Sequence, residues 1–134
     1  MDNSNTDDRY TVTIENNYVR VTFKPGALID QVVLLDAIKA ENVLFGDKQN
    51  EDIWDFRGCT VDESLIYDSM VQVVSFIANR GKRRGHQKTA ILADQDFLFG
   101  MSRMFASLAE RLPYLVRVFR TTEAAEFWLG SEES

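Results

Sequence analysis

The stretch that decides the fold runs from residue 51 to residue 129 and holds three strand-like segments, IWDFRG (53–58), TAILAD (89–94) and VRVFRT (116–121). A helix-patterned run follows each of the first two segments, and a short helix around 127–129 closes the chain. Strands that alternate with helices at this spacing need crossover connections, which join parallel strands. The stretch therefore predicts an α/β fold with a largely parallel sheet.

The N-terminal part of the chain adds two strands and a helix. Residues 10–14 and 18–24 alternate polar and apolar side chains around a polar turn, a pattern typical of a β-hairpin. Residues 28–40 carry a broad apolar stripe, which indicates the first helix. We predict one α/β domain at 10–130, with a mixed five-stranded sheet and the order ββαβαβαβα. Residues 1–9 should form a disordered acidic tail and 131–134 a C-terminal tail.

The ends of the later helices are marked by capping residues. The second helix should begin near Asp62, whose carboxylate can cap its first turn, and the third should end before Pro113. Thr121 or Thr122 should cap the last helix. That helix is too short to persist without tertiary contacts, so we expect it to bury one apolar side, formed by Ala124, Phe127 and Trp128.

Length, charge and cysteine count limit the classes of protein and partner. The 134 residues, 45% of them hydrophobic, are enough for one continuous core. A net charge of −6 disfavours nucleic acid and anionic membranes as partners, since both are bound through excess Lys and Arg. The single cysteine, Cys59, forms no internal disulfide, and no sequence run is apolar enough to span a membrane. We expect a cytoplasmic protein.

Four segments of the chain resemble those of a known family, in the same order: IWDFRG (53–58), TAILA (89–93), FGMSRMF (99–105) and VFRTTEAAEFWL (118–129). With these segments, residues 10–130 resemble the SpoIIAA-like proteins, small relatives of the STAS domains that include anti-sigma-factor antagonists. The resemblance implies a mixed sheet covered by helices on one side. The implied fold is also similar to the lipid-binding CRAL-TRIO domains.

The resemblance also implies a candidate phosphoacceptor. The antagonists carry a Ser or Thr at the start of the helix after the third strand, and Ser64 falls near that position. Asp62 and Glu63 would repel a phosphate group, which carries about −1.5 to −2 charge at neutral pH. A plain polar first turn is therefore favoured over a regulatory phosphoserine at Ser64.

No set of residues in the sequence predicts catalysis. Cys59 follows a strand and precedes a helix, a place that can activate a thiol, but the only histidine, His86, follows the same helix about 25 Å away. One Cys and one His do not make a zinc site, and no glycine-rich phosphate loop is present. Asp94 and Asp96 lie where open α/β sheets bind ligands, although helix capping is the favoured role for both. We predict no enzymatic activity and no cofactor.

The third helix carries more aromatic and methionine side chains than packing on a sheet requires. Phe99 and Met101 lie roughly 160° apart around a helix, so at least one should lie at the margin of the buried stripe. Arg103 should pair with Asp55 or Asp96, or face a ligand groove. The predicted partner or ligand surface consists of Arg57, Cys59, Asp94, Asp96, Phe97, Phe99, Met101 and Arg103.

Two functions remain open. The first is a non-enzymatic regulatory or protein-interaction module of SpoIIAA-like type, which binds a protein partner or a second copy of itself. The second is a binder of a small apolar or lipid-like ligand between helices and sheet, as the CRAL-TRIO likeness implies. An enclosed apolar cavity would favour the second, and a filled core with an exposed apolar patch would favour the first.

Overall fold

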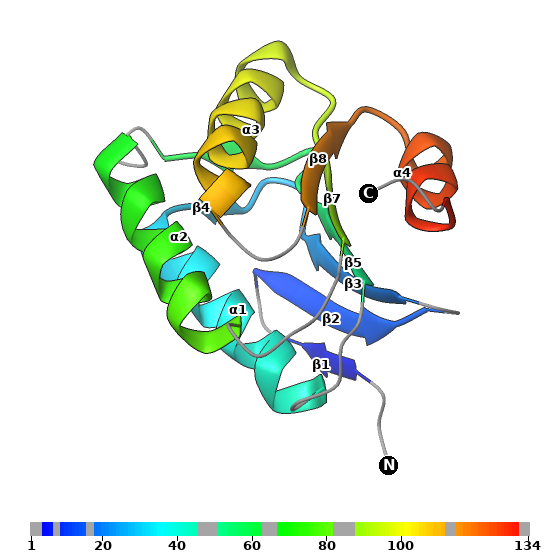
Figure 1. The fold of residues 1–134 in the computed structure, drawn as a ribbon, viewed down its shortest axis with the longest axis horizontal. Coiled ribbons are helices and arrows are strands. Elements are labelled where there is room, and N and C mark those ends of the chain that lie inside the picture. The colour runs from blue at the N-terminus through cyan, green and yellow to red at the C-terminus, as the bar shows by residue number, and fades with distance from the viewer. Residues whose placement is uncertain are drawn as a thin grey trace.

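The computed structural model describes residues 4–6, 9–15, 18–45, 51–62, 67–81, 88–111 and 115–131. Its main sheet has the strand order β1-β2-β3-β5-β7-β8 (Figure 1). These strands are β1 (Ser4–Thr6), β2 (Tyr10–Ile14), β3 (Tyr18–Phe23), β5 (Glu51–Asp55), β7 (Lys88–Leu92) and β8 (Leu115–Phe119). A second sheet pairs β4 (Leu28–Ile29) with β6 (Thr60–Val61). The helices are α1 (Gln31–Phe45), α2 (Tyr67–Gly81), α3 (Asp96–Leu108), the 3₁₀ turn η1 (Ala109–Arg111) and α4 (Thr122–Leu129).

The predicted α/β fold with a mixed sheet is confirmed. β3, β5, β7 and β8 are parallel neighbours, so that Ile53 pairs with Ala90 and Ala90 with Arg117. β2 is antiparallel to β1 and β3. The three crossovers all advance across the sheet in one direction. Because crossover connections between parallel strands share one handedness, α1, α2 and α3 all lie on the same face of the sheet, as Figure 1 shows.

The expectation that all helices cover one side of the sheet is wrong for α4. Side chains alternate along β5, so Trp54 joins the core under α1 and α2, whereas Ile53 joins a second core on the opposite face. In that second core Ile53 and Leu92 pack with Trp128 of α4. Because no strand follows α4, the crossover rule does not constrain it, and it covers the face that the other helices leave open (Figure 1).

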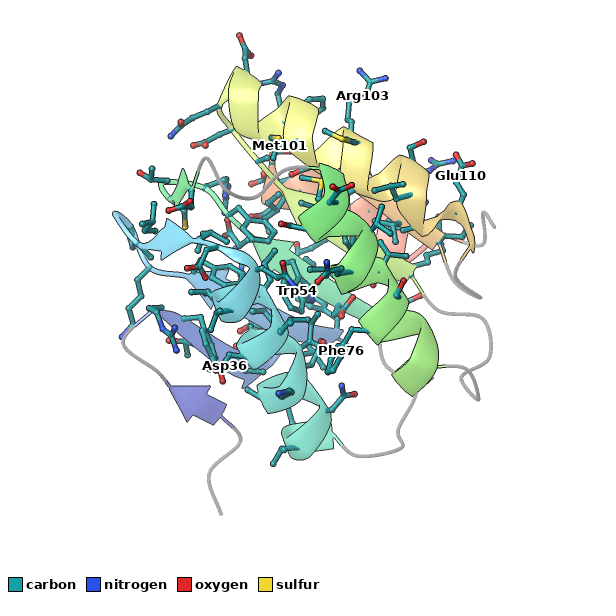
Figure 2. The ribbon with its side chains drawn as sticks, turned by 90° about the vertical axis from the view of Figure 1, so that its left-hand side faces the viewer. Asp36, Trp54, Phe76, Met101, Arg103 and Glu110 are labelled. Atoms are coloured by element: carbon teal, nitrogen blue, oxygen red, sulfur yellow. The ribbon has the colours of Figure 1, made fainter. Side chains whose placement is uncertain are left out.

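The core under α1 and α2 is built around aromatic rings. Phe23 stacks on Phe56 with 4.6 Å between ring centroids, and Trp54 lies 5.8 Å from Phe23. Figure 2 shows Trp54 beneath α1 and α2, with Phe76 of α2 beside it. These contacts fill the layer between the sheet and the two helices with interlocking side chains.

The prediction of a disordered tail at 1–9 is wrong for Ser4–Thr6. These three residues form β1 and pair antiparallel with Thr11–Thr13 of β2. The hairpin leaves the outer edge of β2 with unpaired backbone N–H and C=O groups, and backbone pairing needs no apolar side chain. A short polar segment can therefore extend the sheet from five strands to six.

The first helix begins at Gln31, so its predicted start at residue 28 is wrong. The Asp30 carboxylate accepts a hydrogen bond from the Val33 N–H at 2.9 Å, as an N-cap does. Leu28 and Ile29 instead pair with β6. Asp62 continues that pairing, since its N–H donates to the Ile29 carbonyl at 2.8 Å. The described part of α2 begins at Tyr67, and residues 63–66 lie outside the described residues.

Both ends of α4 are held by side chains. Thr121 is the N-cap, as predicted, and its hydroxyl accepts a hydrogen bond from the Ala124 N–H at 3.2 Å. At the other end the buried Lys88 ammonium donates to the carbonyls of Trp128 and Ser131 at 2.8 and 2.7 Å. These bonds bind backbone carbonyls at and just beyond the last turn of α4 and place a cation at the negative end of the helix.

The predicted packing face of α4 is confirmed for Trp128 and wrong for Ala124 and Phe127. Ala124 is exposed and Phe127 is 83% exposed, whereas Ala125, Trp128 and Leu129 are buried. The Trp128 ring lies 5.5 Å from the Phe119 ring. The sheet therefore selects the helix face centred on Trp128, and Phe127 is left in solvent.

Replacement of Trp128 tests this packing. Trp128→Ala should lower the free energy of unfolding by about 3 to 5 kcal/mol, because it removes a large buried ring that anchors α4. The measurement is chemical denaturation followed by fluorescence and circular dichroism. Phe127→Ala is the matched control, which should change stability by less than about 0.5 kcal/mol. Equal losses for the two variants would contradict the described packing face.

Candidate functional site

The carboxyl ends of β3, β5, β7 and β8 lie along one edge of the sheet because the strands are parallel. Ligands of open α/β sheets bind at this edge. Arg57 follows β5, Asp94 and Asp96 follow β7, and Arg120 follows β8. This carboxyl edge, with the adjoining outer face of α3, is the candidate site.

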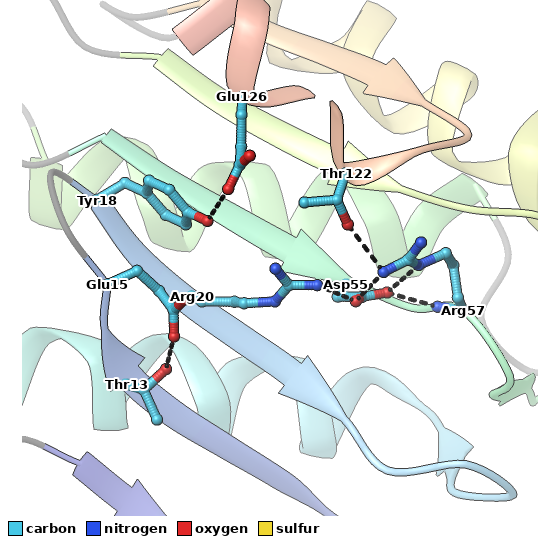
Figure 3. A network of polar contacts seen from close by, with 8 residues as sticks. All are labelled: Thr13, Glu15, Tyr18, Arg20, Asp55, Arg57, Thr122 and Glu126. Atoms are coloured by element: carbon cyan, nitrogen blue, oxygen red, sulfur yellow. Dashed lines mark hydrogen bonds and ion pairs between the residues drawn. The ribbon is translucent and has the colours of Figure 1, made fainter. Parts of the chain in front are cut away.

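Asp55 is the centre of a buried ion-pair network at this edge (Figure 3). Its carboxylate is 7% exposed and accepts hydrogen bonds from Arg57 Nε at 3.0 Å, Arg57 Nη2 at 2.9 Å and Arg20 Nη2 at 2.7 Å. Burial by itself would raise the pKa of Asp55, but the hydrogen bonds from Arg57 and Arg20 lower that pKa below its usual value. The carboxylate therefore stays ionised and holds two guanidinium groups.

Arg57 connects this network to α4. Its Nη2 also donates to the Thr122 hydroxyl at 3.0 Å, as Figure 3 shows. The hydrogen bond to Asp55 raises the pKa of Arg57 above its usual value. Further along the same face, the Tyr18 hydroxyl donates to the Glu126 carboxylate of α4 at 2.6 Å. Burial, followed by this bond to Glu126, raises the pKa of Tyr18 to about 12. The predicted surface residue Arg57 is thus engaged within the chain.

Cys59 is buried and does not contribute to a surface. Its Sγ lies 3.5 Å from the Lys24 carbonyl oxygen. Burial, and then the negative charges of Asp55 and Asp94, raise the pKa of the thiol to about 11. The thiol is therefore protonated at neutral pH and is not a nucleophile there. The other reactive candidates, Ser64 and His86, lie outside the described residues.

Arg120, which directly follows β8, contacts residues that follow β7 at the same edge of the sheet. Its guanidinium lies over the Phe99 ring at 4.2 Å and donates to the Asp96 carboxylate at 3.0 Å and to the Asp94 carbonyl at 3.2 Å. The predicted pairing of Arg103 with Asp55 or Asp96 is wrong: among the described residues Asp55 pairs with Arg20 and Arg57, Asp96 pairs with Arg120, and Arg103 is exposed. Arg120 is absent from the predicted surface, although its place directly after β8 puts it at this edge.

The outer face of α3 is a narrow stripe of exposed residues. These exposed residues occur at positions 96, 100, 103 and 107, a spacing of i, i+4, i+7 and i+11 that places them on one side of the helix. Figure 2 shows Arg103 projecting away from the rest of the molecule. Phe99 and Met101 are both half-buried, and at least one was expected at the margin of the buried stripe. Phe99 lies beside the exposed stripe, whereas Met101 lies about 160° from Arg103 around the helix. The side chain of Phe97 lies outside the described residues. We call the following exposed residues the α3 stripe: Asp96, Gly100, Arg103 and Ser107.

Gly100 is not required by the packing of this chain. A Cβ atom built on Gly100 would meet no atom within 4 Å, and its backbone does not have the positive φ that favours glycine. Glycine inside a helix costs stability relative to alanine. The open space next to Gly100 therefore lies on the outer surface of α3 and not between packed parts of the chain.

No family model, curated protein or solved structure matches the chain. Within the described ranges, no group of three or more His, Cys, Asp or Glu side chains is placed to hold a metal ion. Of the helices in the described part of the chain, none is long and apolar enough to cross a membrane.

Replacement of Asp55 should destabilise the protein in a pH-dependent way. Asp55→Asn should lower the free energy of unfolding at pH 7 by about 3 kcal/mol, because it leaves two arginines without their carboxylate. The pKa of Asp55 is lower in the folded chain than in the unfolded chain, where it is about 3.9. The ionised carboxylate therefore stabilises the fold at pH values above about 3.9, and this stabilisation is lost as the pH falls through the folded-state pKa. The difference between Asp55→Asn and the wild type should therefore shrink below about pH 4.

Urea denaturation of both proteins from neutral to acid pH measures this difference. Asp94→Asn serves as the control, since Asp94 is exposed and lies at the same edge. It should change stability by less than about 0.5 kcal/mol. A constant difference between Asp55→Asn and wild type at all pH values would contradict an ionic role for Asp55.

Replacement of Gly100 should stabilise the isolated chain. Gly100→Ala should raise the free energy of unfolding by about 0.5 to 1 kcal/mol, because alanine restricts the unfolded chain and nothing obstructs its Cβ. Thermal and urea denaturation measure the effect. A loss of stability would show that glycine is needed for the fold itself.

Proposed function

We propose that the chain is a non-enzymatic regulatory or protein-interaction module of SpoIIAA-like type, acting in the cytoplasm through the carboxyl edge and the α3 stripe. The observation that carries the proposal is the exposed Gly100 between the half-buried Phe99 and Met101. Glycine lowers the stability of a free helix. A partner that approaches closely at this position would offset that cost.

The composition of this surface also supports a protein partner. The centres of protein interfaces are enriched in aromatic residues, Met and Arg. Here the half-buried Phe99 and Met104 flank the exposed Arg103 on one helix, and Arg120 covers part of the Phe99 ring. The surface is built on a helix and on strand ends held by Asp55, so binding requires little ordering of the chain.

The chemistry of the buried polar groups supports a non-enzymatic role. Asp55 is occupied by Arg20 and Arg57, which leaves it a poor general base, and the Cys59 thiol is protonated at neutral pH. The resemblance to SpoIIAA-like proteins is consistent with a parallel sheet in which β5, β7 and β8 each precede a helix.

A small apolar or lipid-like ligand between helices and sheet is the less favoured alternative. The Phe23 and Phe56 rings stack in that layer, and Trp54 packs against both. Native mass spectrometry of the purified protein separates the two functions. The bare chain mass, alone or in multiples, supports the interaction module, whereas a retained small molecule on the chain supports the ligand binder.

Site-specific photo-crosslinking tests the interaction surface directly. A photoreactive amino acid at position 107, introduced in the cells that make the protein, should give a crosslinked product of discrete mass, because Ser107 is exposed on the α3 stripe and its replacement leaves Asp96 and Arg103 in place. The same probe at Lys39 is the control, since Lys39 is an exposed residue of α1, and α2 lies between α1 and α3 (Figure 2). Absence of a product at position 107, or identical products at both positions, would contradict the proposal.

A further inference from the structure

The α3 stripe is complementary in charge to itself. Asp96 and Arg103 have opposite charges and lie on the same face of α3, about 10 Å apart along an axis that rises 1.5 Å per residue. In a two-fold symmetric pair each surface meets the same surface of the other copy. A two-fold axis at the midpoint of Asp96 and Arg103 therefore brings each Asp96 opposite Arg103 of the second copy when the helices are antiparallel.

Gly100 lies almost on that two-fold axis. The midpoint of positions 96 and 103 falls between Phe99 and Gly100, half a residue from the glycine. The distance between two packed helices depends on the side chains at their contact, so a glycine there allows the closest approach. One register thus pairs both charges and places Gly100 at the crossing point.

The charges also determine whether the two α3 helices run parallel or antiparallel to each other. In a parallel arrangement in the same register, Asp96 would face Asp96 and Arg103 would face Arg103, which is repulsive. In the antiparallel arrangement both contacts are attractive. The half-buried Phe99 lies beside the crossing point and would lose its remaining exposure to solvent.

Asp96 has room for a second arginine. Its side chain is 96% exposed, and it accepts one hydrogen bond from Arg120. A carboxylate offers about four acceptor positions. Asp55 in the same chain already accepts two guanidinium groups. Arg103 of the second copy can therefore bind Asp96 while Arg120 keeps its own bond.

We propose that the α3 stripe is a self-association surface on which α3 of a second copy packs antiparallel, with Gly100 at the crossing and two symmetric Asp96–Arg103 ion pairs. This inference rests on the proposed function and names its partner. One face of a 13-residue helix is smaller than the interface of a permanent dimer. The association should therefore be reversible, dependent on protein concentration and weakened by salt.

Charge exchange between two variants provides the test. Asp96→Arg places two arginines on the stripe, and Arg103→Asp places two aspartates there. Each variant alone should associate about tenfold more weakly than the wild type or worse, because like charges then meet. An equimolar mixture should recover a heterodimer, since each arginine of one variant faces an aspartate of the other. Sedimentation equilibrium and native mass spectrometry over a concentration series measure both effects.

Gly100→Gln tests the crossing point without a change of charge. The longer side chain should abolish association while the melting temperature stays equal or rises, because nothing in the chain obstructs its Cβ. A wild type that is monomeric at every concentration would overturn the proposal, as would a mixture that fails to form the heterodimer or a Gly100→Gln variant that still associates. If the probe at position 107 then captures a different protein, the interaction module stands and only self-association fails. If it captures nothing, both fail.

Discussion

The parallel pairing of β3, β5, β7 and β8 is the constraint on which the rest of this structure depends. Parallel strands need crossovers, and three crossovers in one direction place α1, α2 and α3 on one face. The opposite face of β7 and β8 is then available to α4, whose Trp128 closes the second core. The same pairing brings four carboxyl ends to one edge, where charged residues from distant parts of the chain meet.

Two aspartates at this edge show how burial changes the role of the same chemical group. Asp55 lies within the fold, accepts hydrogen bonds from two arginines of its own chain and keeps a lowered pKa. Its arginines connect β3, β5 and the start of α4. Asp96 binds one arginine but is almost fully exposed, so its remaining acceptor positions face solvent. The buried carboxylate stabilises the edge, and the exposed one is available to a partner.

The outer face of α3 differs from the faces of α1 and α2 that build the core. It combines a glycine that the fold does not require, one acidic and one basic residue, and apolar side chains at both margins. One symmetric antiparallel arrangement of two α3 helices accounts for the glycine and for both charges together.

The sequence by itself determined the features that depend on local pattern: the three parallel strands after residue 50, the hairpin, the aromatic and methionine content of α3, and a threonine cap of α4 at position 121 or 122. These follow from side-chain period and from capping chemistry within a few residues. Only the tertiary structure decided the features that depend on residues far apart. Arg20 reaches Asp55 across 35 positions, β1 adds a strand without any apolar pattern, and α4 buries Leu129 instead of Phe127. Such contacts depend on which strands become neighbours and which helix face meets the sheet. The local spacing of apolar residues in the sequence does not contain this information.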